Sequence, residues 1–101
     1  YTNEEVLEII KEHVSCEVKA RSTRLRPSSI RPDHPIVQAG LALGRTTYGS
    51  PTTSDQALLD IPSLKLGVGD RARSHSADEF VHLSEIREGI ELYIKMLSAI
   101  L

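Results

Sequence analysis

The segment with the clearest potential for chemistry follows two closely spaced glycines, Gly67 and Gly69. It places His75 after the glycine turn, with Asp78 and Glu79 three and four residues beyond the histidine. A histidine that binds a metal ion is commonly held in its orientation by a nearby carboxylate. The spacing therefore makes His75 a candidate metal ligand, and metal-assisted hydrolysis is the chemistry that such a ligand would serve.

Spacing alone also allows a simpler interpretation, in which His75 is a surface residue and the acidic residues cap the next helix. If the segment were helical, His75, Asp78, Glu79 and His82 would share one face. Glu79 and His82 would then have the Glu-x-x-His spacing of di-iron helix bundles. Because that architecture needs carboxylates from other helices and the chain has no second copy of the motif, we do not expect it here.

A second candidate site is a loop with consecutive polar side chains, Thr53, Ser54 and Asp55. Two hydroxyls and a carboxylate can hydrogen-bond a polar substrate. Ser54 is more simply the N-cap of a short helix that begins at Asp55. Since no glycines flank Ser54, the loop does not resemble the turn that exposes a nucleophilic serine.

Basic residues are concentrated in one stretch near the N-terminus: Lys19, Arg21, Arg24, Arg26 and Arg31. Such a stretch can bind phosphate, but no aromatic residue is interleaved for stacking on nucleic-acid bases. The favoured interpretation is a solvated face with ion pairs to the glutamates of the first helix. One of these arginines could also bind a carboxylate ligand through two hydrogen bonds.

Composition describes a single ordinary domain, or a piece of one, with 101 residues, 12 of them basic and 14 acidic. The net charge of -2 gives no general electrostatic reason to expect nucleic acid or an anionic membrane as partner. The single cysteine, Cys16, cannot form an internal disulfide, and no apolar run is long enough to span a membrane. These features predict a cytoplasmic location.

Hydrophobic periodicity predicts a helix over residues 3–14, introduced by a capping box of Thr2 and Glu5. From Cys16 onward apolar and polar residues alternate as far as Ser22, which predicts a half-buried strand running towards Pro27. The first part of the chain therefore reads as half of a small α+β layer.

The proline-rich stretch 31–35 predicts a domain junction, because proline biases the residue before it away from helix. A mostly apolar helix over 36–43 should follow and end at Gly44. After a long polar loop, residues 63–69 read as a short strand, and a final amphipathic helix should begin after Ser84 as N-cap. Two separated strands do not make a stable sheet, so we expect further strands to precede this chain.

Three blocks occur in order along the chain: Gly49–Asp55, Pro62–Asp70 and Ser74–Val81. Together they resemble the C-terminal third of the dinuclear zinc deacylases and exopeptidases, which include acetylornithine deacetylase, succinyl-diaminopimelate desuccinylase, aminoacylase and carboxypeptidase G. The most specific part is the His-x-x-Asp-Glu block after the Gly-x-Gly-Asp turn. Val68 departs from the family, which has Gly-Pro-Gly more often than Gly-Val-Gly.

The resemblance implies an α/β fold, with residues 33–101 as the C-terminal part of an α/β/α metal-binding domain. Residues 1–32 would be the closing helix and strand of an α+β lid, which often dimerises in this family. His75 would be the last ligand of one of two zinc ions, for which cobalt can substitute. Asp78 and Glu79 would orient the loop, and residues 53–55 would line the substrate pocket.

No catalytic residue is assigned to this chain, because the family's other ligands, its bridging aspartate and its general base would lie earlier. The expected function is therefore that of part of a zinc-dependent enzyme of amino-acid biosynthesis, most like the acetylornithine deacetylase of arginine biosynthesis. The substrate would be a small N-acyl amino acid. The resemblance implies that the intact protein forms a homodimer through the lid, and neither nucleic acid nor a membrane is expected as partner. A dipeptidase or carboxypeptidase of the same family, or a non-catalytic oligomerisation module, are the alternatives.

Overall fold

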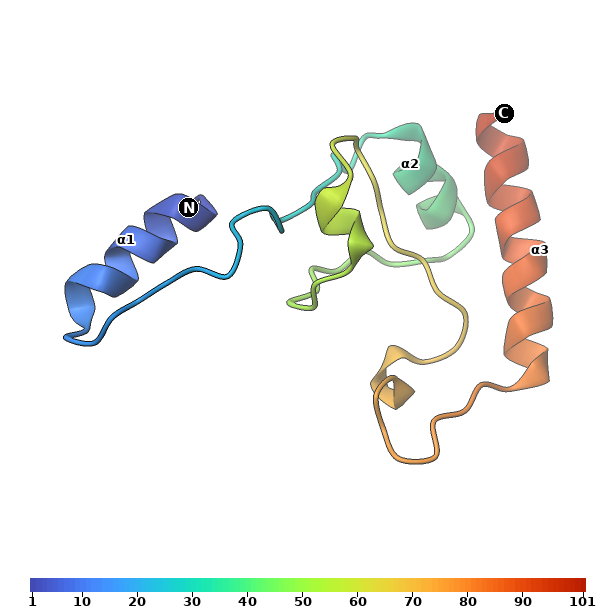
Figure 1. Ribbon diagram of the computed structural model, residues 1–101. Coiled ribbons are helices and arrows are strands. Elements are labelled where there is room, and N and C mark those ends of the chain that lie inside the picture. The colour runs from blue at the N-terminus through green and yellow to red at the C-terminus, as the bar shows by residue number, and fades with distance from the viewer. The chain divides into compact units, whose positions relative to one another are not determined.

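A computed structural model describes all 101 residues as helices joined by irregular segments (Figure 1). The elements are α1 (Asn3–His13), α2 (Pro35–Ala42), the 3-10 helices η1 (Asp55–Leu58) and η2 (Arg71–Arg73), and α3 (Leu83–Ile100). The residues group into two compact units. The first unit contains residues 1–29 and 50–63, and the second unit contains residues 30–49 and 64–101. The predicted boundary between residues 32 and 33 stays a prediction.

The predicted α/β fold class is wrong for this chain, which contains no strand. Neither the alternating segment from Cys16 nor residues 63–69 forms a β-ladder. A strand needs a neighbour that accepts and donates its backbone hydrogen bonds, whereas a helix satisfies those bonds within itself. The alternating pattern describes a strand's faces but supplies no such neighbour.

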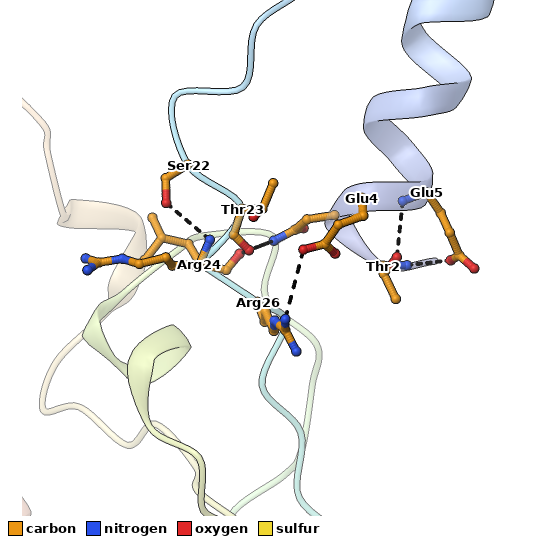
Figure 2. A network of polar contacts seen from close by, with 9 residues as sticks. Thr2, Glu4, Glu5, Ser22, Thr23, Arg24 and Arg26 are labelled. Carbon is orange, nitrogen blue, oxygen red and sulfur yellow. Dashed lines mark hydrogen bonds and ion pairs between the residues drawn. The ribbon is translucent and has the colours of Figure 1, made fainter.

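Helix α1 begins as predicted, with a reciprocal capping box at its N-terminus (Figure 2). The backbone N–H of Glu5 donates to Oγ1 of Thr2 at 3.1 Å, and the backbone N–H of Thr2 donates to Oε2 of Glu5 at 2.7 Å. The helix ends at His13, whose ring Nδ1 lies 2.7 Å from the carbonyl oxygen of Ile9. Local capping therefore accounts for the start of α1.

Within the first unit, side chains at the start of α1 hold the irregular segment 22–26 (Figure 2). The amide Nδ2 of Asn3 donates to the carbonyl oxygens of Thr23 and Leu25, each at 2.9 Å. An ion pair joins Arg26 to Glu4 at 4.0 Å, so one residue of the basic stretch pairs with a glutamate of the first helix as predicted. Lys19 pairs with Glu17 and Arg31 pairs with Asp33, outside that helix. No residue of α1 is buried.

Helix α2 ends as predicted, in a Schellman motif centred on Gly44. Gly44 has a φ of 78°, in the left-handed region that glycine adopts without a steric penalty. The backbone N–H of Arg45 donates to the carbonyl of Gly40 at 3.0 Å, and that of Gly44 donates to the carbonyl of Leu41 at 3.0 Å. These two bonds satisfy carbonyls that would otherwise have no partner.

Helix α3 begins two residues earlier than predicted, at Leu83, so the expected N-cap at Ser84 is wrong. The carboxylate of Glu85 accepts the backbone N–H of His82 at 2.8 Å. His82 therefore occupies the N-cap position, and Glu85 stands three residues later as in a capping box. The glutamate, rather than the serine hydroxyl, decides where the helix starts.

The core of the second unit lies between α2 and α3, which pack side by side (Figure 1). Its apolar members are Val37 and Ala39 from α2, and Leu92 and Met96 from α3. Gly40 lets α2 approach the methyl group of Met96 closely. None of the helices combines the length and apolarity that a membrane crossing requires.

Helix α3 also carries apolar side chains that this core does not cover. They are exposed and recur at helical spacing beside the buried face: Ile86, Ile90, Tyr93, Ile94 and Leu97. The helix is therefore apolar over more of its circumference than its contact with α2 uses.

Candidate functional site

The turn that carries His75 begins with a capped 3-10 helix, η2. Gly69 adopts a φ of 74°, which redirects the chain into Asp70. The Oδ1 atom of Asp70 accepts the backbone N–H of Ala72 at 2.8 Å, so Asp70 is the N-cap of η2. The glycine turn predicted from the sequence therefore leads directly into the segment with the candidate ligand.

His75 has a left-handed backbone conformation, with a φ of 59°. His75 and Asp78, with a φ of 54°, are the two residues other than glycine whose φ is positive. For such residues this conformation costs about 1–2 kcal/mol, so neighbouring contacts must hold it. One of them is direct, since the Oε2 atom of Glu79 accepts the backbone N–H of His75 at 3.1 Å.

A second set of contacts closes the turn behind His75. The backbone N–H of Ser76 donates to the carbonyl oxygen of Arg73 at 3.3 Å, and the hydroxyl of Ser76 donates to the same oxygen. The backbone of His75 therefore lies between two anchored neighbours, whereas its ring makes no hydrogen bond and is exposed.

An ion pair between Arg73 and Glu85 connects this turn to the first turn of α3. Nη1 of Arg73 lies 2.8 Å from Oε2 of Glu85, and Nη2 lies 2.6 Å from Oε1, so the pair is bidentate. The side chains are only 22% and 23% exposed. The Arg73 guanidinium, followed by the backbone N–H of His82, lowers the pKa of Glu85 to about 2. Glu85 in turn raises the pKa of Arg73.

The segment that precedes η2 is fastened to α3 by two contacts. The hydroxyl of Tyr93 donates to the carbonyl oxygen of Leu66. Val68 lies so close to Gly89 that a β-carbon at residue 89 would overlap Cγ1 of Val68. Gly89 therefore has a packing role, in addition to the weakening of the helix that its sequence position predicts.

The sequence-predicted site residues lie in both units. His75, Asp78 and Glu79 share one turn of the second unit, and all three are exposed. Residues 53–55 belong to the first unit. Glu79 contacts the backbone of His75 rather than its ring, and the side chain of Asp78 makes no hydrogen bond.

The hydroxyl loop forms the start of η1, in agreement with the prediction of a short helix from Asp55. Ser54 is at the N-cap position, but its hydroxyl makes no capping hydrogen bond. Its carbonyl oxygen instead accepts the backbone N–H of Ala57 at 2.9 Å. Nε2 of Gln56 donates to the hydroxyl of Ser63 at 3.0 Å, which closes the loop that follows. The hydroxyl of Ser54 is thus not used by the helix.

No group of three or more histidine, cysteine, aspartate or glutamate side chains is arranged to hold a metal ion. Catalytic zinc takes three protein ligands and a water molecule. A zinc ion at His75 would therefore need further ligands from outside this turn. The exposed imidazole, with both ring nitrogens free of hydrogen bonds, fits the part of one such ligand.

Sequence reasoning missed the roles of Arg73 and Glu85. A capping box usually begins with serine, threonine, aspartate or asparagine, so His82 three residues before Glu85 gave no clear signal in the sequence. Arg73 lies twelve residues before Glu85, and in an irregular segment that separation does not predict whether two side chains meet. The contact of Val68 with Gly89 could not be predicted either, because a glycine in a helix indicates lower helix stability and does not indicate which segment packs against it.

Comparison of the chain with protein-family profiles and with curated protein sequences gives no match. The resemblance to dinuclear zinc deacylases therefore stays a prediction. The function proposed below depends on the residue pattern and on the geometry of the turn around His75.

Proposed function

We propose that this chain is the C-terminal part of a zinc-dependent amide hydrolase that removes the acyl group from an N-acyl amino acid. His75 would bind one of two zinc ions through a ring nitrogen of its neutral imidazole. The observation that carries the proposal is the conformation of His75. A residue that is not glycine is held at a φ of 59° while its exposed ring remains free of hydrogen bonds. Held non-glycine residues of this kind are concentrated at functional sites.

Bound zinc would supply Lewis acidity and a water molecule of lowered pKa, which are what amide hydrolysis requires. The turn's own contribution is a fixed backbone from which the imidazole extends. Glu79 supports this role by fixing the backbone of His75, since outer carboxylates and hydrogen bonds commonly orient metal ligands. Asp78 would orient the loop from the neighbouring left-handed position.

The substrate would be recognised by the polar residues of the first unit. Thr53 and Asp55 are exposed, and the hydroxyl of Ser54 is not engaged in capping. Arg24 or Arg26 would bind the free carboxylate of an N-acyl amino acid, because guanidinium and carboxylate pair through two hydrogen bonds. In the intact enzyme, substitution of either arginine by alanine should raise the Michaelis constant; an unchanged constant for both would remove them from substrate binding.

The proposal also accounts for the exposed apolar faces. The uncovered apolar side chains of α3 would pack against the rest of the catalytic domain. Those of α1, which are Val6, Ile9 and Ile10, suit the homodimer expected of a lid, as does exposed Val14 directly after the helix. We accordingly propose a cytoplasmic enzyme with two zinc ions, replaceable by cobalt.

A second candidate function is a non-catalytic oligomerisation module. The observation that favours it is that α1 has no buried residue although one side of it is apolar. A dipeptidase or carboxypeptidase would share the zinc site, so substrate assays must separate these enzymes from a deacylase.

Metal content separates the hydrolase from the module. The full-length protein that carries this chain should hold two zinc ions per subunit, measured by elemental analysis after dialysis. His75→Ala should lose one of them. His13→Ala, which changes an exposed histidine in α1, should lose none. Equal zinc content in the wild type and His75→Ala would contradict the hydrolase and favour the module.

A further inference from the structure

We propose that Arg73 and Glu85 are positioning residues, whose ion pair holds the turn 74–79 and thereby fixes the backbone from which His75 presents its ring. The proposal rests on the proposed function only for the nature of the ligand at His75. The claim that the ion pair holds the turn depends only on contacts within the second unit.

The geometry of the ion pair favours a single arrangement of the Arg73 and Glu85 side chains. The two terminal nitrogens of the Arg73 guanidinium each donate to one carboxylate oxygen of Glu85, at 2.8 Å and 2.6 Å, which favours one relative orientation of the two groups. The guanidinium also lies 4.8 Å from the centre of the Phe80 ring, and its Nη1 lies 3.5 Å from the Phe80 carbonyl oxygen. Arg73 therefore contacts the chain on both sides of the turn.

The ion pair is connected to His75 through residues close to it in the chain. Arg73 is two residues from His75, and its carbonyl oxygen accepts both the backbone N–H and the hydroxyl of Ser76. Glu85 holds the other end of the loop, because it also accepts the backbone N–H of His82 at 2.8 Å. These backbone contacts fix the direction in which the Cα–Cβ bond of His75 leaves the turn.

The pair is separate from the apolar core, so its loss should loosen the turn without unfolding the helices. Buried Leu92 and Met96 lie further along α3 and pack on α2. Arg71 provides a matched control within the same 3-10 helix. Its guanidinium lies 4.6 Å from the centre of the Tyr48 ring and makes no ion pair.

The first test is the mobility of the turn, measured by nitrogen-15 relaxation of the 101-residue chain. His75 and Ser76 should have backbone order parameters of about 0.85, typical of rigid backbone. In Arg73→Lys and in Glu85→Gln they should fall below about 0.6, while those of Leu92 and Met96 stay unchanged. Arg71→Lys and Glu88→Gln should leave the turn rigid.

A flexible His75 in the wild type, or a rigid one in both Arg73→Lys and Glu85→Gln, would overturn the proposal. A charge-reversed protein with both Arg73→Glu and Glu85→Arg should recover part of the lost order. Each reversal alone should be as mobile as Arg73→Lys. Recovery of backbone order in the double variant would show that Arg73 and Glu85 act through their ion pair and not through two independent contacts.

The second test is the zinc affinity of the full-length protein, measured by competition with a chromophoric chelator. Arg73→Lys should lower the affinity by about 10- to 100-fold, the usual effect of removing a residue that orients a ligand. Arg71→Lys should not change it. If the wild type binds no zinc but the turn loosens as described, the proposed function fails and the positioning role stands. If zinc binds with equal affinity to Arg73→Lys, the positioning role fails and the function stands.

Discussion

Two arginine–glutamate pairs, one in each unit, show how differently the same residue types are used. Arg26 and Glu4 approach to 4.0 Å through one pair of atoms, with side chains 72% and 54% exposed. Arg73 and Glu85 form two hydrogen bonds, and their side chains are 22% and 23% exposed. Water competes with the first pair far more than with the second. Oppositely charged residues therefore stabilise the structure only where the two groups are well aligned and also shielded from water.

The same contrast extends to the backbone near each pair. The capping box and Asn3 hold the first unit through hydrogen bonds to groups close to the start of α1. In the second unit, His75 and Asp78 have left-handed conformations, and Glu79 accepts the backbone N–H of His75. The bidentate pair of Arg73 and Glu85 joins the two ends of the segment that contains them. We therefore expect substitutions in the second unit to have the larger consequences.

The largest effect is expected from Gly89→Ala. Alanine would normally strengthen a helix by about 1 kcal/mol relative to glycine. Here its β-carbon would overlap Val68, and such overpacking typically costs about 1–3 kcal/mol. The free energy of unfolding, from urea titration, should therefore fall by up to about 2 kcal/mol.

The control for this substitution is Val68→Ala, which removes the overlapping Cγ1 methyl group and leaves Cβ of residue 68 at 3.3 Å from the added carbon. In the Val68→Ala background, Gly89→Ala should stabilise the protein by about 1 kcal/mol. Stabilisation by Gly89→Ala alone would contradict the close contact between Val68 and α3.

The second prediction concerns pH. Because Arg73 and the N–H of His82 lower the pKa of Glu85 from 4.5 to about 2, the folded state binds this proton less readily than the unfolded state. The stabilisation by the pair should be complete above about pH 4.5 and lost progressively as the pH falls through about 2. Carbon-13 NMR of the Glu85 carboxyl should report a midpoint near 2.

Arg73→Lys should raise that midpoint, since lysine cannot form the bidentate pair. Arg71→Lys is again the control and should leave it in place. A Glu85 midpoint near 4.5 in the wild type would show that the pair is not formed in solution.

A smaller effect is expected from Asn3→Ala in the first unit. It removes the donor to the carbonyl oxygens of Thr23 and Leu25. Loss of an ordinary hydrogen bond costs about 0.5–1.5 kcal/mol. Amide exchange should quicken in residues 22–26 and change little in the middle of α1. Asn3→Asp should behave like alanine, because a carboxylate cannot donate; retained protection in both variants would refute the contact.

The smallest effect is expected from Arg26→Ala. An exposed ion pair at this distance contributes little, so the free energy of unfolding should change by less than about 0.5 kcal/mol. Salt should have no measurable influence on the difference between Arg26→Ala and the wild type. A larger destabilisation would mean that the two pairs are more alike than their exposure indicates.

The success of sequence reasoning differed between elements in a way that follows from how each is stabilised. The capping box of α1 and the glycine that ends α2 were predicted correctly, because both depend on hydrogen bonds between residues close in the chain. The strands from Cys16 and over 63–69 were wrong, because strand pairing depends on a partner that the local pattern does not specify. The start of α3 was displaced because Glu85, and not Ser84, supplies the capping interaction.

For the candidate site, the sequence identified His75 and its neighbouring carboxylates but not how they are held. Glu79 was expected to orient the loop, and it contacts the backbone of His75. The ion pair that closes the loop joins Arg73 to Glu85 across an irregular segment, for which no periodicity exists. The metal itself stays a prediction.

Residue pattern alone was enough to place the three α-helices of this protein to within a few residues and to indicate which side chains could do chemistry. Helix signals are local, because caps and periodic apolar residues act within a few residues of each other. The pairing of Arg73 with Glu85, the packing of Val68 on Gly89 and the left-handed conformation of His75 became known from the folded structure alone. These features depend on distances between segments that the chain must first fold to bring together.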